Sequence, residues 1–406
     1  MKVLVVNAGS SSLKYQLVDM TDESVIAKGI CERIGTAGNI SHKLADGRKF
    51  EKDVPMPDHT VAFSCVVEAL TNKEFGVIES MQEISAVGHR IVQGGSLFSH
   101  SVLVDEDVIQ KIEGLAELAP LHNMAHVQGI RACIACMGKD VPQVVVFDTA
   151  FHQTMPQTSY MYAVPYEYYE KYGVRRYGFH GTSHRYVSGV MTDILGKVEG
   201  TKIITCHIGN GSSITAVKDG KCMDTSMGFT PLAGVEMGTR CGDIDPSVVT
   251  FIMKKDGLSP DQMNELMNKK SGFFGISKFS SDSRDIEDAI SHGEKDAHYK
   301  QAKLAQDILC QGIKKYIGSY AAEMNGVDAI VFTAGIGENS PALRAEVLSD
   351  LDVLGIKIDP KMNEKAFRQS ENICISAPDS KVLVYVIPTN EELVIARDTK
   401  EIVEKL

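Results

Sequence analysis

The most informative stretch of this chain is VLVVNAGSSSLKYQLVD, residues 3–19. Its apolar first part, residues 3–6, is followed by a turn of small residues and then by an alternating segment, residues 13–18, which together predict a β-hairpin. The turn from Gly9 to Ser12 offers bare backbone N–H groups and three hydroxyls, and Lys14 follows it closely. These are the parts of a phosphate-binding turn, although an ordinary Ser/Gly hairpin has the same composition.

A second stretch, IITCHIGNGSSITAV at residues 203–217, repeats this pattern about half a chain away. Gly211-Ser212-Ser213 falls where Gly9-Ser10-Ser11 falls in the first copy, again between an apolar strand and a returning strand. Two copies at this distance indicate a duplicated domain rather than a short-period solenoid. Two such hairpins on opposite sides of a cleft would grip one polyphosphate from both sides.

The length and composition are those of a globular protein. The 406 residues are enough for two domains, and 43% of them are hydrophobic and 23% charged. No apolar run approaches the roughly 18 residues of a membrane span, so we expect no membrane partner. The net charge of −11 argues against nucleic acid as a partner, and a nucleotide would need a locally basic or metal-assisted site. Nine scattered cysteines indicate a reduced, cytoplasmic chain.

Two charged residues stand at the ends of predicted strands. Residues 85–92 read as a buried strand that contains Arg90, and residues 143–148 read as a second strand that ends at Asp148. Charges at the carboxyl ends of parallel strands often face a cleft, where they serve in anion or metal binding. A surface salt bridge for Arg90 and a helix N-cap for Asp148 are the alternatives.

Two further residues carry candidate chemistry. His180 and His184 are four apart, as zinc ligands on a helix are, but the glutamate of H-E-x-x-H is absent and Gly181 lies between them, so we reject zinc. Arg240 lies in a Gly-rich loop, residues 237–246, where an arginine can reach developing negative charge. A structural arginine is the alternative.

Residues 328–339, DAIVFTAGIGEN, predict a strand, a Gly-x-Gly turn that contacts a nucleotide, and then a helix. The third glycine of the dinucleotide fingerprint is absent, and no G-x-x-x-x-G-K-[ST] occurs, which excludes the P-loop class. Other predicted helices are one capped by residues 280–285, a long one at 297–323, and a C-terminal one capped by Thr389 or Asn390.

Several motifs together resemble those of a known family. Residues 7–14 (NAGSSSLK) and 176–184 (RYGFHGTSH) resemble the two signature stretches of the acetate kinases. Residues 237–240 (MGTR), 332–339 (FTAGIGEN) and 388–392 (PTNEE) are similar to further motifs of that family. The resemblance covers nearly the whole chain, and several of its motifs are long and specific.

The resemblance implies an α/β fold of duplicated ribonuclease-H-like domains with an interdomain cleft, as in actin, the sugar kinases and the heat-shock chaperone ATPases. The first domain would span residues 1–150 and bind the acid and phosphate. The second would span residues 151–387 and bind the nucleotide. The C-terminal helix, residues 388–406, would pack back on the first domain.

The resemblance also implies a reaction. ATP and acetate would give ADP and acetyl phosphate, reversibly and by direct in-line transfer. Magnesium would be required, with manganese as a substitute, and the chain would form a homodimer.

The roles of the family fall on matching positions. Arg90 would hold the acetate carboxylate, while Arg240 and His180 would stabilise the transferring phosphoryl group. Asp148 completes the catalytic set. Acetate is already ionised near neutral pH and needs no base, so we expect Asp148 to orient the metal shell, or Arg90 through a salt bridge.

The remaining implied roles concern binding. Asn7 and Glu391 would organise magnesium and its waters. The acid pocket would comprise Arg90, Val92, Leu121, His122, Phe179 and Pro231. The nucleotide and its phosphates would contact Ser10, Ser12, Lys14, His207, Gly209, Asn210, Gly211, Asp282, Ser283, Arg284, Gly335, Ile336, Gly337, Glu338 and Asn339.

The sequence departs from the family pattern at two places near the proposed acid-binding rim. Gln93 stands where histidine is expected, and Met124-Ala125-His126 replaces a more usual Pro-x-Asn. A propionate or butyrate kinase is therefore one alternative, although Val92 favours a small pocket because a smaller residue there would admit another methylene. A non-catalytic, actin-like nucleotide clamp is the alternative from a different class.

Overall fold

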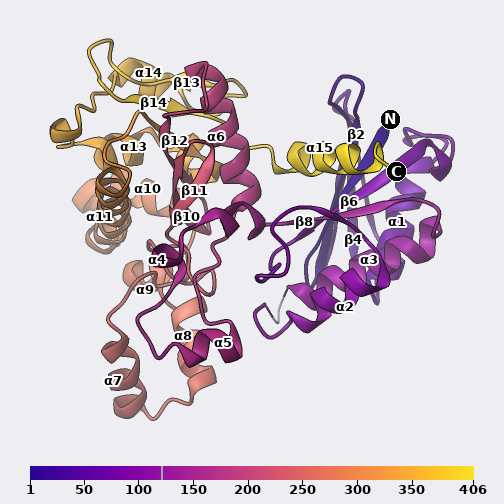
Figure 1. Ribbon diagram of the computed structural model, residues 1–406, viewed down its shortest axis with the longest axis horizontal. Helices are drawn as coiled ribbons and strands as arrows, with labels where there is room; N and C mark the ends of the chain where they lie inside the picture. Colours follow the sequence, from indigo (N-terminus) through magenta and orange to yellow (C-terminus); the bar gives the residue numbers. More distant parts are fainter. Residues whose placement is uncertain (120–121) are drawn as a thin grey trace. The chain divides into compact units, whose positions relative to one another are not determined.

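The computed structural model describes residues 1–119 and 122–406. The chain divides into two compact units. Unit 1 comprises residues 1–153 together with residues 390–406, and unit 2 comprises residues 154–389. Each unit is built on its own β-sheet with helices packed against it (Figure 1), which makes the fold mixed α/β, as predicted.

Unit 1 contains an eight-stranded sheet in the order β5-β4-β3-β2-β1-β6-β8-β7. Strands β1 to β5 form an antiparallel meander, β6 and β8 continue the sheet in parallel with β1, and β7 closes the edge antiparallel to β8. The strands are β1 Lys2–Ala8, β2 Ser12–Asp19, β3 Ser24–Glu32, β4 Asn39–Leu44, β5 Lys49–Asp53, β6 Ile84–Ile91, β7 Val102–Leu103 and β8 Gln143–Phe147.

Both faces of this sheet carry apolar residues that need cover. Leu4, Val6 and Leu13 point to one face and pack with Phe63 of α1 (His59–Thr71) and Cys133 of α3 (Asn123–Met137). On the other face, apolar residues of β1 and β8 pack against α15 (Glu391–Val403). Figure 1 shows α15, in yellow, beside the strands of this unit. Alternation of buried side chains along β1 and β2 thus produces two cores.

Unit 2 contains a six-stranded sheet in the order β11-β10-β9-β12-β14-β13. Its main core lies between this sheet and α11 (Tyr299–Glu323), whose buried face carries Leu309, Ile313 and Ile317. The strands are β9 Lys202–Ile208, β10 Ser212–Lys218, β11 Lys221–Thr225, β12 Ala329–Thr333, β13 Ile373–Cys374 and β14 Leu383–Val386.

The two sheets share one strand order. In unit 1, β3, β2 and β1 form an antiparallel meander that continues in parallel through β6 and β8; in unit 2, β11, β10 and β9 form the meander that continues through β12 and β14. The Gly/Ser turns fall at the same place, because Ala8 pairs with Leu13 and Ile208 pairs with Ser212. The repeat seen in the sequence therefore corresponds to equivalent hairpins in the two sheets.

Most predicted helices lie where the sequence places them. Asn390 caps α15 by accepting from Leu393 N, and Asp282 caps α10. The turn predicted at Gly335-x-Gly337 is wrong in form, because residues Ala334–Asn339 make a short helix, α12, entered through Ala334 in the left-handed region (φ 66°). The other helices are α2 Glu106–Gly114, α4 Gln157–Tyr160, α5 Glu167–Tyr172, α6 Gly181–Leu195, α7 Pro246–Asp256, α8 Pro260–Lys269, α9 Gly272–Ser277, α10 Ser283–Ser291, α13 Pro341–Leu348 and α14 Pro360–Lys365.

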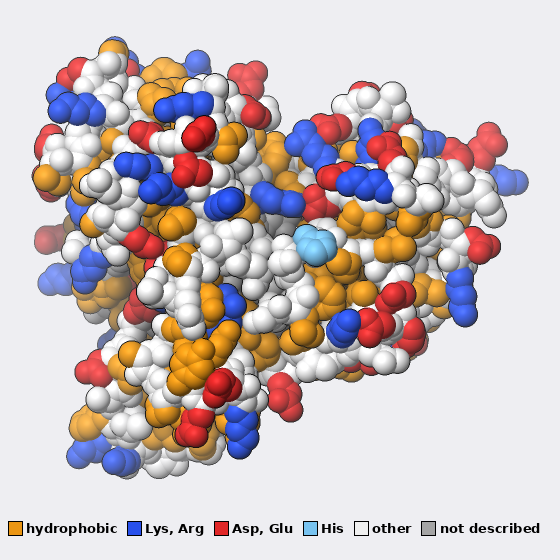
Figure 2. Space-filling view, in the orientation of Figure 1, with side chains coloured by type: hydrophobic (Ala, Val, Ile, Leu, Met, Phe, Trp, Pro, Cys, Tyr) orange, Lys and Arg blue, Asp and Glu red, His pale blue; other side chains and the backbone are white. Residues whose placement is uncertain are grey.

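On the molecular face drawn in Figure 2, acidic and basic side chains are interspersed with apolar ones. Across residues 1–119 and 122–406, no helix combines the length and the apolar character that crossing a membrane requires.

Candidate active site

An ion pair stands at the carboxyl ends of two parallel strands in unit 1. Arg90 belongs to β6 and Asp148 directly follows β8, and the two strands pair in parallel, so both side chains reach the same edge of the sheet. Arg90 Nε donates to Asp148 Oδ1 at 3.0 Å, and Arg90 Nη2 donates to Asp148 Oδ2 at 2.7 Å. This bidentate contact is the salt bridge predicted for Asp148, and it fixes the direction of the guanidinium.

Glu391, in the first turn of α15, adds a second carboxylate beside this pair. Burial disfavours the charge of Arg90, but Asp148 and Glu391 outweigh it, so the pKa of Arg90 is raised. Burial raises the pKa of Glu391 to about 7, with Arg90 opposing the shift and Asp148 and Glu392 adding to it. The half-buried Arg90 thus stands against two carboxylates, one buried and one half-buried, and the cluster favours a further cation.

The oxygen atoms of this cluster fit magnesium. Glu391 Oε1 is buried and has no hydrogen-bond partner in the part of the chain that the structure describes, and an orphan carboxylate oxygen is a natural ligand for a hard cation. Among the same residues, no group of three or more His, Cys, Asp and Glu side chains could hold a metal ion alone. Magnesium commonly keeps several waters and binds through one or two carboxylates and substrate phosphates, so the orphan oxygen of Glu391 is compatible with that mode of binding.

The first Gly/Ser turn lies at the end of the same sheet. Asn7 of β1 pairs directly with Lys14 of β2, and between them Gly9 N donates to Ser12 O at 2.7 Å. The ring of His59 contacts Gly9 O at 2.7 Å through Nε2. Ser10 and Lys14 are exposed, so both are free to meet a phosphate.

The predicted acid-pocket residues are placed as follows. Val92 is half-buried just beyond β6, and His122 is exposed immediately before α3. In unit 2, Phe179 is buried and Pro231 is half-buried. Leu121 lies outside the described residues.

His180 of unit 2 has a strained backbone. It precedes α6 in the left-handed region, with φ 57° and ψ 23°, a conformation that costs a non-glycine residue energy and is concentrated at functional sites. Its Nδ1 contacts Ser213 Oγ at 2.9 Å, and the same hydroxyl contacts His184 Nε2 at 2.7 Å. The ring of His207 stacks on that of His180 with centroids 4.1 Å apart. The strained residue is thus fixed by its neighbours.

Arg240 lies next to His180 and has no carboxylate partner in the part of the chain that the structure describes. A Cβ added to Gly211 would stand 3.4 Å from Arg240 Nη1 and 3.5 Å from His180 Nε2, so the second Gly/Ser turn, the guanidinium and the imidazole meet at one point. Arg240 Nη1 donates to Pro231 O at 3.1 Å, but no carboxylate in residues 1–119 or 122–406 pairs with it. Burial alone lowers the pKa of Arg240, and an anion would compensate its charge.

A cavity of about 880 Å³ adjoins this point in unit 2. Eight of the fifteen residues predicted to contact the nucleotide line it, namely Gly209, Asn210, Asp282, Ser283, Arg284, Gly335, Ile336 and Asn339. Three separate sequence segments therefore meet where the sequence predicted a nucleotide, and the volume is in the range of sites for molecules of that size.

The cavity also shows which residues the sequence reasoning missed. Phe273, Phe367 and Arg368 line it, and so does Gly238. A Cβ at Gly238 would lie 2.1 Å from Asn210 Oδ1 and 3.0 Å from Ser281 O, so any larger residue would displace the Asn210 side chain from the cavity wall. The MGTR motif contains this glycine, but no local pattern indicates that it meets Asn210. Nothing in the sequence marked the two phenylalanines.

Glu338 has a local task within α12 and does not line the cavity. Its Oε1 accepts from Ala334 N at 2.7 Å and from Thr389 N at 3.1 Å. The carboxylate therefore holds the strained Ala334 turn in place. Gly337 and Gly211 also lie outside the cavity lining, and His207 contacts Ser183 Oγ at 2.8 Å.

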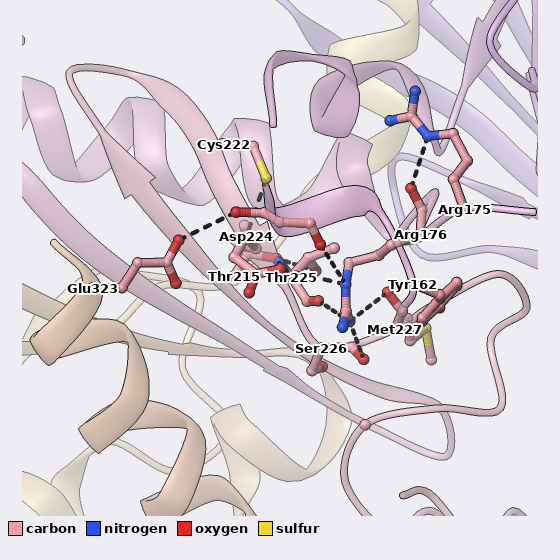
Figure 3. Close-up of polar contacts among 12 residues, drawn as sticks. Tyr162, Arg175, Arg176, Thr215, Cys222, Asp224, Thr225, Ser226, Met227 and Glu323 are labelled. Atoms are coloured by element: carbon pink, nitrogen blue, oxygen red, sulfur yellow. Dashed lines mark hydrogen bonds and ion pairs between the residues drawn. The ribbon is translucent and has the colours of Figure 1, made fainter. Parts of the chain in front are cut away.

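Arg176 connects the segment before His180 to strand β11 (Figure 3). Its Nη1 donates to Thr225 O at 2.6 Å and to Ser226 O at 3.1 Å, while its Nε pairs with Asp224 Oδ1 at 3.5 Å. Tyr177 N then donates to Gly228 O at 3.0 Å. Arg176, noticed in the sequence only as part of a motif, thus ties the segment that leads to His180 to the end of β11.

A strained histidine beside an arginine that has no carboxylate partner in the described chain, next to a nucleotide-sized cavity, is typical of the class of phosphotransferases. The model of the acetokinase family matches residues 2–397. The chain belongs to the acetokinase family.

Relatives of known name agree over the full length. The chain is 58% identical to the acetate kinase of Thermotoga maritima, with all of both chains covered. It is 59% identical to that of Methanosarcina mazei, covering all of this chain and 97% of the relative. The crystal structure of Porphyromonas gingivalis acetate kinase superposes with a TM-score of 0.94 at 48% identity over 99% of each chain. A propionate kinase from Francisella tularensis gives 0.90 at 40% identity, covering 98% of this chain and 99% of that one.

Proposed function

We propose that this chain transfers the γ-phosphoryl group of ATP to acetate, giving acetyl phosphate and ADP, reversibly and by direct in-line transfer. The observation that carries the proposal is Arg240, an arginine without a counter-ion that meets His180 at the Gly211 turn. Full-length similarity to acetate kinases supports the choice of acid. The acceptor is thus the carboxyl group of a short-chain acid.

In this proposal Arg90 binds the acid. Asp148 holds the guanidinium by two hydrogen bonds, which leaves Arg90 Nη1 for the acetate carboxylate. Asp148 has no proton to remove, because acetate is ionised near neutral pH and its oxygen attacks phosphorus directly. The role of Asp148 is therefore to orient Arg90 and the water shell of the metal, which makes it a positioning residue.

Phosphoryl transfer requires alignment and neutralisation of charge on the γ-phosphoryl group. Arg240 and His180 supply positive charge and hydrogen bonds to its equatorial oxygens. Asn7 and Glu391 would hold magnesium, or manganese in its place, which neutralises phosphate charge when bound. Lys14 and the two Gly/Ser turns bind phosphate oxygens, and the cavity of unit 2 holds the nucleoside.

Two properties of the whole protein belong to the proposal. A homodimer is supported by exposed apolar side chains on α7 and α11, including Phe251 at 61% and Leu304 at 52% exposure. A cytoplasmic location is supported by nine free cysteines. Sedimentation velocity checks the first property, and fractionation of cells that express the chain checks the second.

The reaction is tested by trapping the acyl phosphate as a hydroxamate with acetate, propionate and butyrate in parallel. We expect kcat/KM for acetate to exceed that for propionate by about tenfold, because one methylene in a small pocket is worth about 1–3 kcal/mol. A ratio below one would make the chain a kinase of longer acids. If no hydroxamate formed with any of the three acids, the proposed reaction would be wrong.

A further inference from the structure

The four residues that follow β6 have no strand partner for their backbone. Residues 92–95 come directly after the Arg90 strand, and their peptide groups are held by side chains instead. Val92 N donates to His126 Nε2 at 3.3 Å, and Asn123 Nδ2 donates to Gln93 O at 3.0 Å. Both partners come from the first turn of α3, so the helix start fixes the segment beyond Arg90.

The second half of the segment, Gly94 and Gly95, is held by side chains that follow β8. Gly94 N donates to Thr149 Oγ1 at 3.0 Å, and Gln153 Nε2 donates to Gly95 O at 3.2 Å. Gly95 N also donates to Gln93 Oε1 at 2.9 Å. Thr149 is the residue after Asp148, so the partner of Arg90 and the partner of Gly94 are neighbours in sequence.

Glycine is required twice in this segment. A Cβ at Gly94 would lie 2.8 Å from the Phe147 ring, and Gly95 has φ +58° in the left-handed region. Such a conformation persists only where its surroundings over-determine it. The side-chain hydrogen bonds supply that constraint.

His126 is suited to this contact because it is neutral. A backbone N–H can only donate, so Nε2 must carry a lone pair, and the ring proton must sit on Nδ1. Burial, with Arg90 adding to it, lowers the pKa of His126 to about 3. The ring is 3% exposed and therefore accepts from Val92 throughout the working pH range.

We propose that His126 is a positioning residue that sets acid selectivity by holding Val92 at its place beyond Arg90. The inference rests on the proposed function, in which Val92 forms one wall of the acid pocket. Without the acceptor at position 126, the N–H of the half-buried Val92 loses its partner, and the segment relaxes around its glycines. The wall then moves while the Arg90–Asp148 ion pair stays.

The test compares two variants of His126 with a matched control. His126→Leu keeps the volume and removes the acceptor, whereas His126→Gln places an amide oxygen where Nε2 stood. Gln128→Leu, on the exposed side of the same helix, makes a similar change away from the segment. Acetate and propionate kinetics and nucleotide KM are measured for all three, with amide hydrogen exchange for residues 92–95.

For His126→Leu we expect KM for acetate to rise about tenfold, the size of a lost buried hydrogen bond. The preference for acetate over propionate should fall several-fold, with KM for ATP within twofold of the parent. Residues 92–95 should exchange faster, and His126→Gln should restore all of these values. An unchanged acid preference, with only a lower Tm, would overturn the inference.

The two proposals fail in different ways. If the parent chain phosphorylates none of the acids, the proposed function falls, and the selectivity role falls with it. If the parent is active but residues 92–95 keep their exchange protection in His126→Leu, only the role of His126 falls.

Discussion

The two units surround the arginine of the candidate site in opposite ways. In unit 1, Arg90 and Asp148 form a bidentate pair, and Glu391 stands close enough to influence both. In unit 2, Arg240 and Glu236 lie four residues apart on one loop, yet burial alone shifts the pKa of each. Both oxygens of Glu236 are buried without a hydrogen-bond partner among the residues that the structure describes. Arg90 is thus paired with a carboxylate, whereas no carboxylate of the described residues pairs with Arg240, although unit 2 does pair Arg176 with Asp224.

The presence or absence of a paired carboxylate suits the two arginines to different tasks. A paired arginine has a fixed direction and one remaining edge, which suits recognition of a small carboxylate. An arginine without a counter-ion keeps its full charge for a group that arrives or develops later, as the phosphoryl group does during transfer. Keeping Arg240 free costs stability, and so does leaving Glu236 unpaired.

Removing Arg240 should have the largest effect. In Arg240→Ala we expect kcat to fall by about 10³–10⁵-fold, the value of an arginine at a transferring phosphoryl group, while ATP binds within a few-fold of the parent. Hydroxamate trapping measures turnover, and calorimetry measures ATP binding. A turnover close to that of the parent would favour the nucleotide-clamp alternative.

Glu236 should make unit 2 less stable as the pH rises. Its pKa is 4.5 when exposed and about 8 in the fold because burial disfavours its charge. Between these values the unfolded chain is ionised and the fold is not, so the folded state binds the extra proton. The stability is intact below about pH 4.5 and falls as the pH rises to 8, by roughly 3–5 kcal/mol.

Urea unfolding at pH 5 and pH 8 checks this prediction. Glu236→Gln should flatten the pH dependence and be more stable than the parent at pH 8. Glu294→Gln, an exposed change in the same unit, should keep the parent slope. If the free energy of unfolding changed equally with pH in the parent and in Glu236→Gln, the prediction would be wrong, and Glu236 would have a partner in solution.

Breaking the pair of unit 1 should separate affinity from stability. Arg90→Ala should raise KM for acetate by about 10–100-fold with a smaller change in kcat, as loss of uniform binding does. It also leaves Asp148, 1% exposed, without its partner. The double variant Arg90→Ala/Asp148→Ala should regain Tm without regaining KM, and recovery of both would contradict the acid-binding role.

A change at Gly238 tests the nucleotide side with a smaller expected effect. Its Cβ would meet Asn210 Oδ1 at 2.1 Å, so Gly238→Ala should weaken ATP binding about tenfold, within the cost of displacing one packed polar group. Gly318→Ala in α11, where a Cβ meets nothing within 4 Å in the described chain, is the matched control. Calorimetry measures the ATP affinity of both variants, and only Gly238→Ala should bind ATP more weakly than the parent.

Local sequence was enough for the strands and turns on which the site depends. Alternation and a Gly/Ser turn at residues 9–12 predicted a hairpin, and its copy at residues 209–213 predicted an equivalent one, because both signals are local. The Arg90–Asp148 pair was also predictable, since parallel strands bring their carboxyl ends together. The helix caps at Asp282 and Asn390 followed from residue type alone.

Other parts of the site depend on approaches between distant segments. The contact between Gly238 and Asn210, and the bonds from His126 to Val92, join residues that are 28 and 34 apart. No periodicity encodes such contacts. Glu338 shows a related limit, because a carboxylate beside a glycine turn can serve either a ligand or the backbone, and here it accepts from Ala334 and Thr389.

The hydroxyl of Ser213 links the protonation states of His180 and His184 in unit 2. Thr205 Oγ1 lies 2.7 Å from His184 Nδ1, and it accepts a hydrogen bond when the ring proton of a neutral His184 is on Nδ1. A neutral His184 then takes the Ser213 hydroxyl proton at Nε2, and Ser213 in turn accepts from His180 Nδ1. With that nitrogen committed, His180 can offer a proton from Nε2 only as imidazolium. In this tautomer of His184, His180 donates to the transferring phosphoryl group only as an imidazolium ion, and ¹⁵N shifts of the ring nitrogens of both histidines report whether that tautomer is adopted.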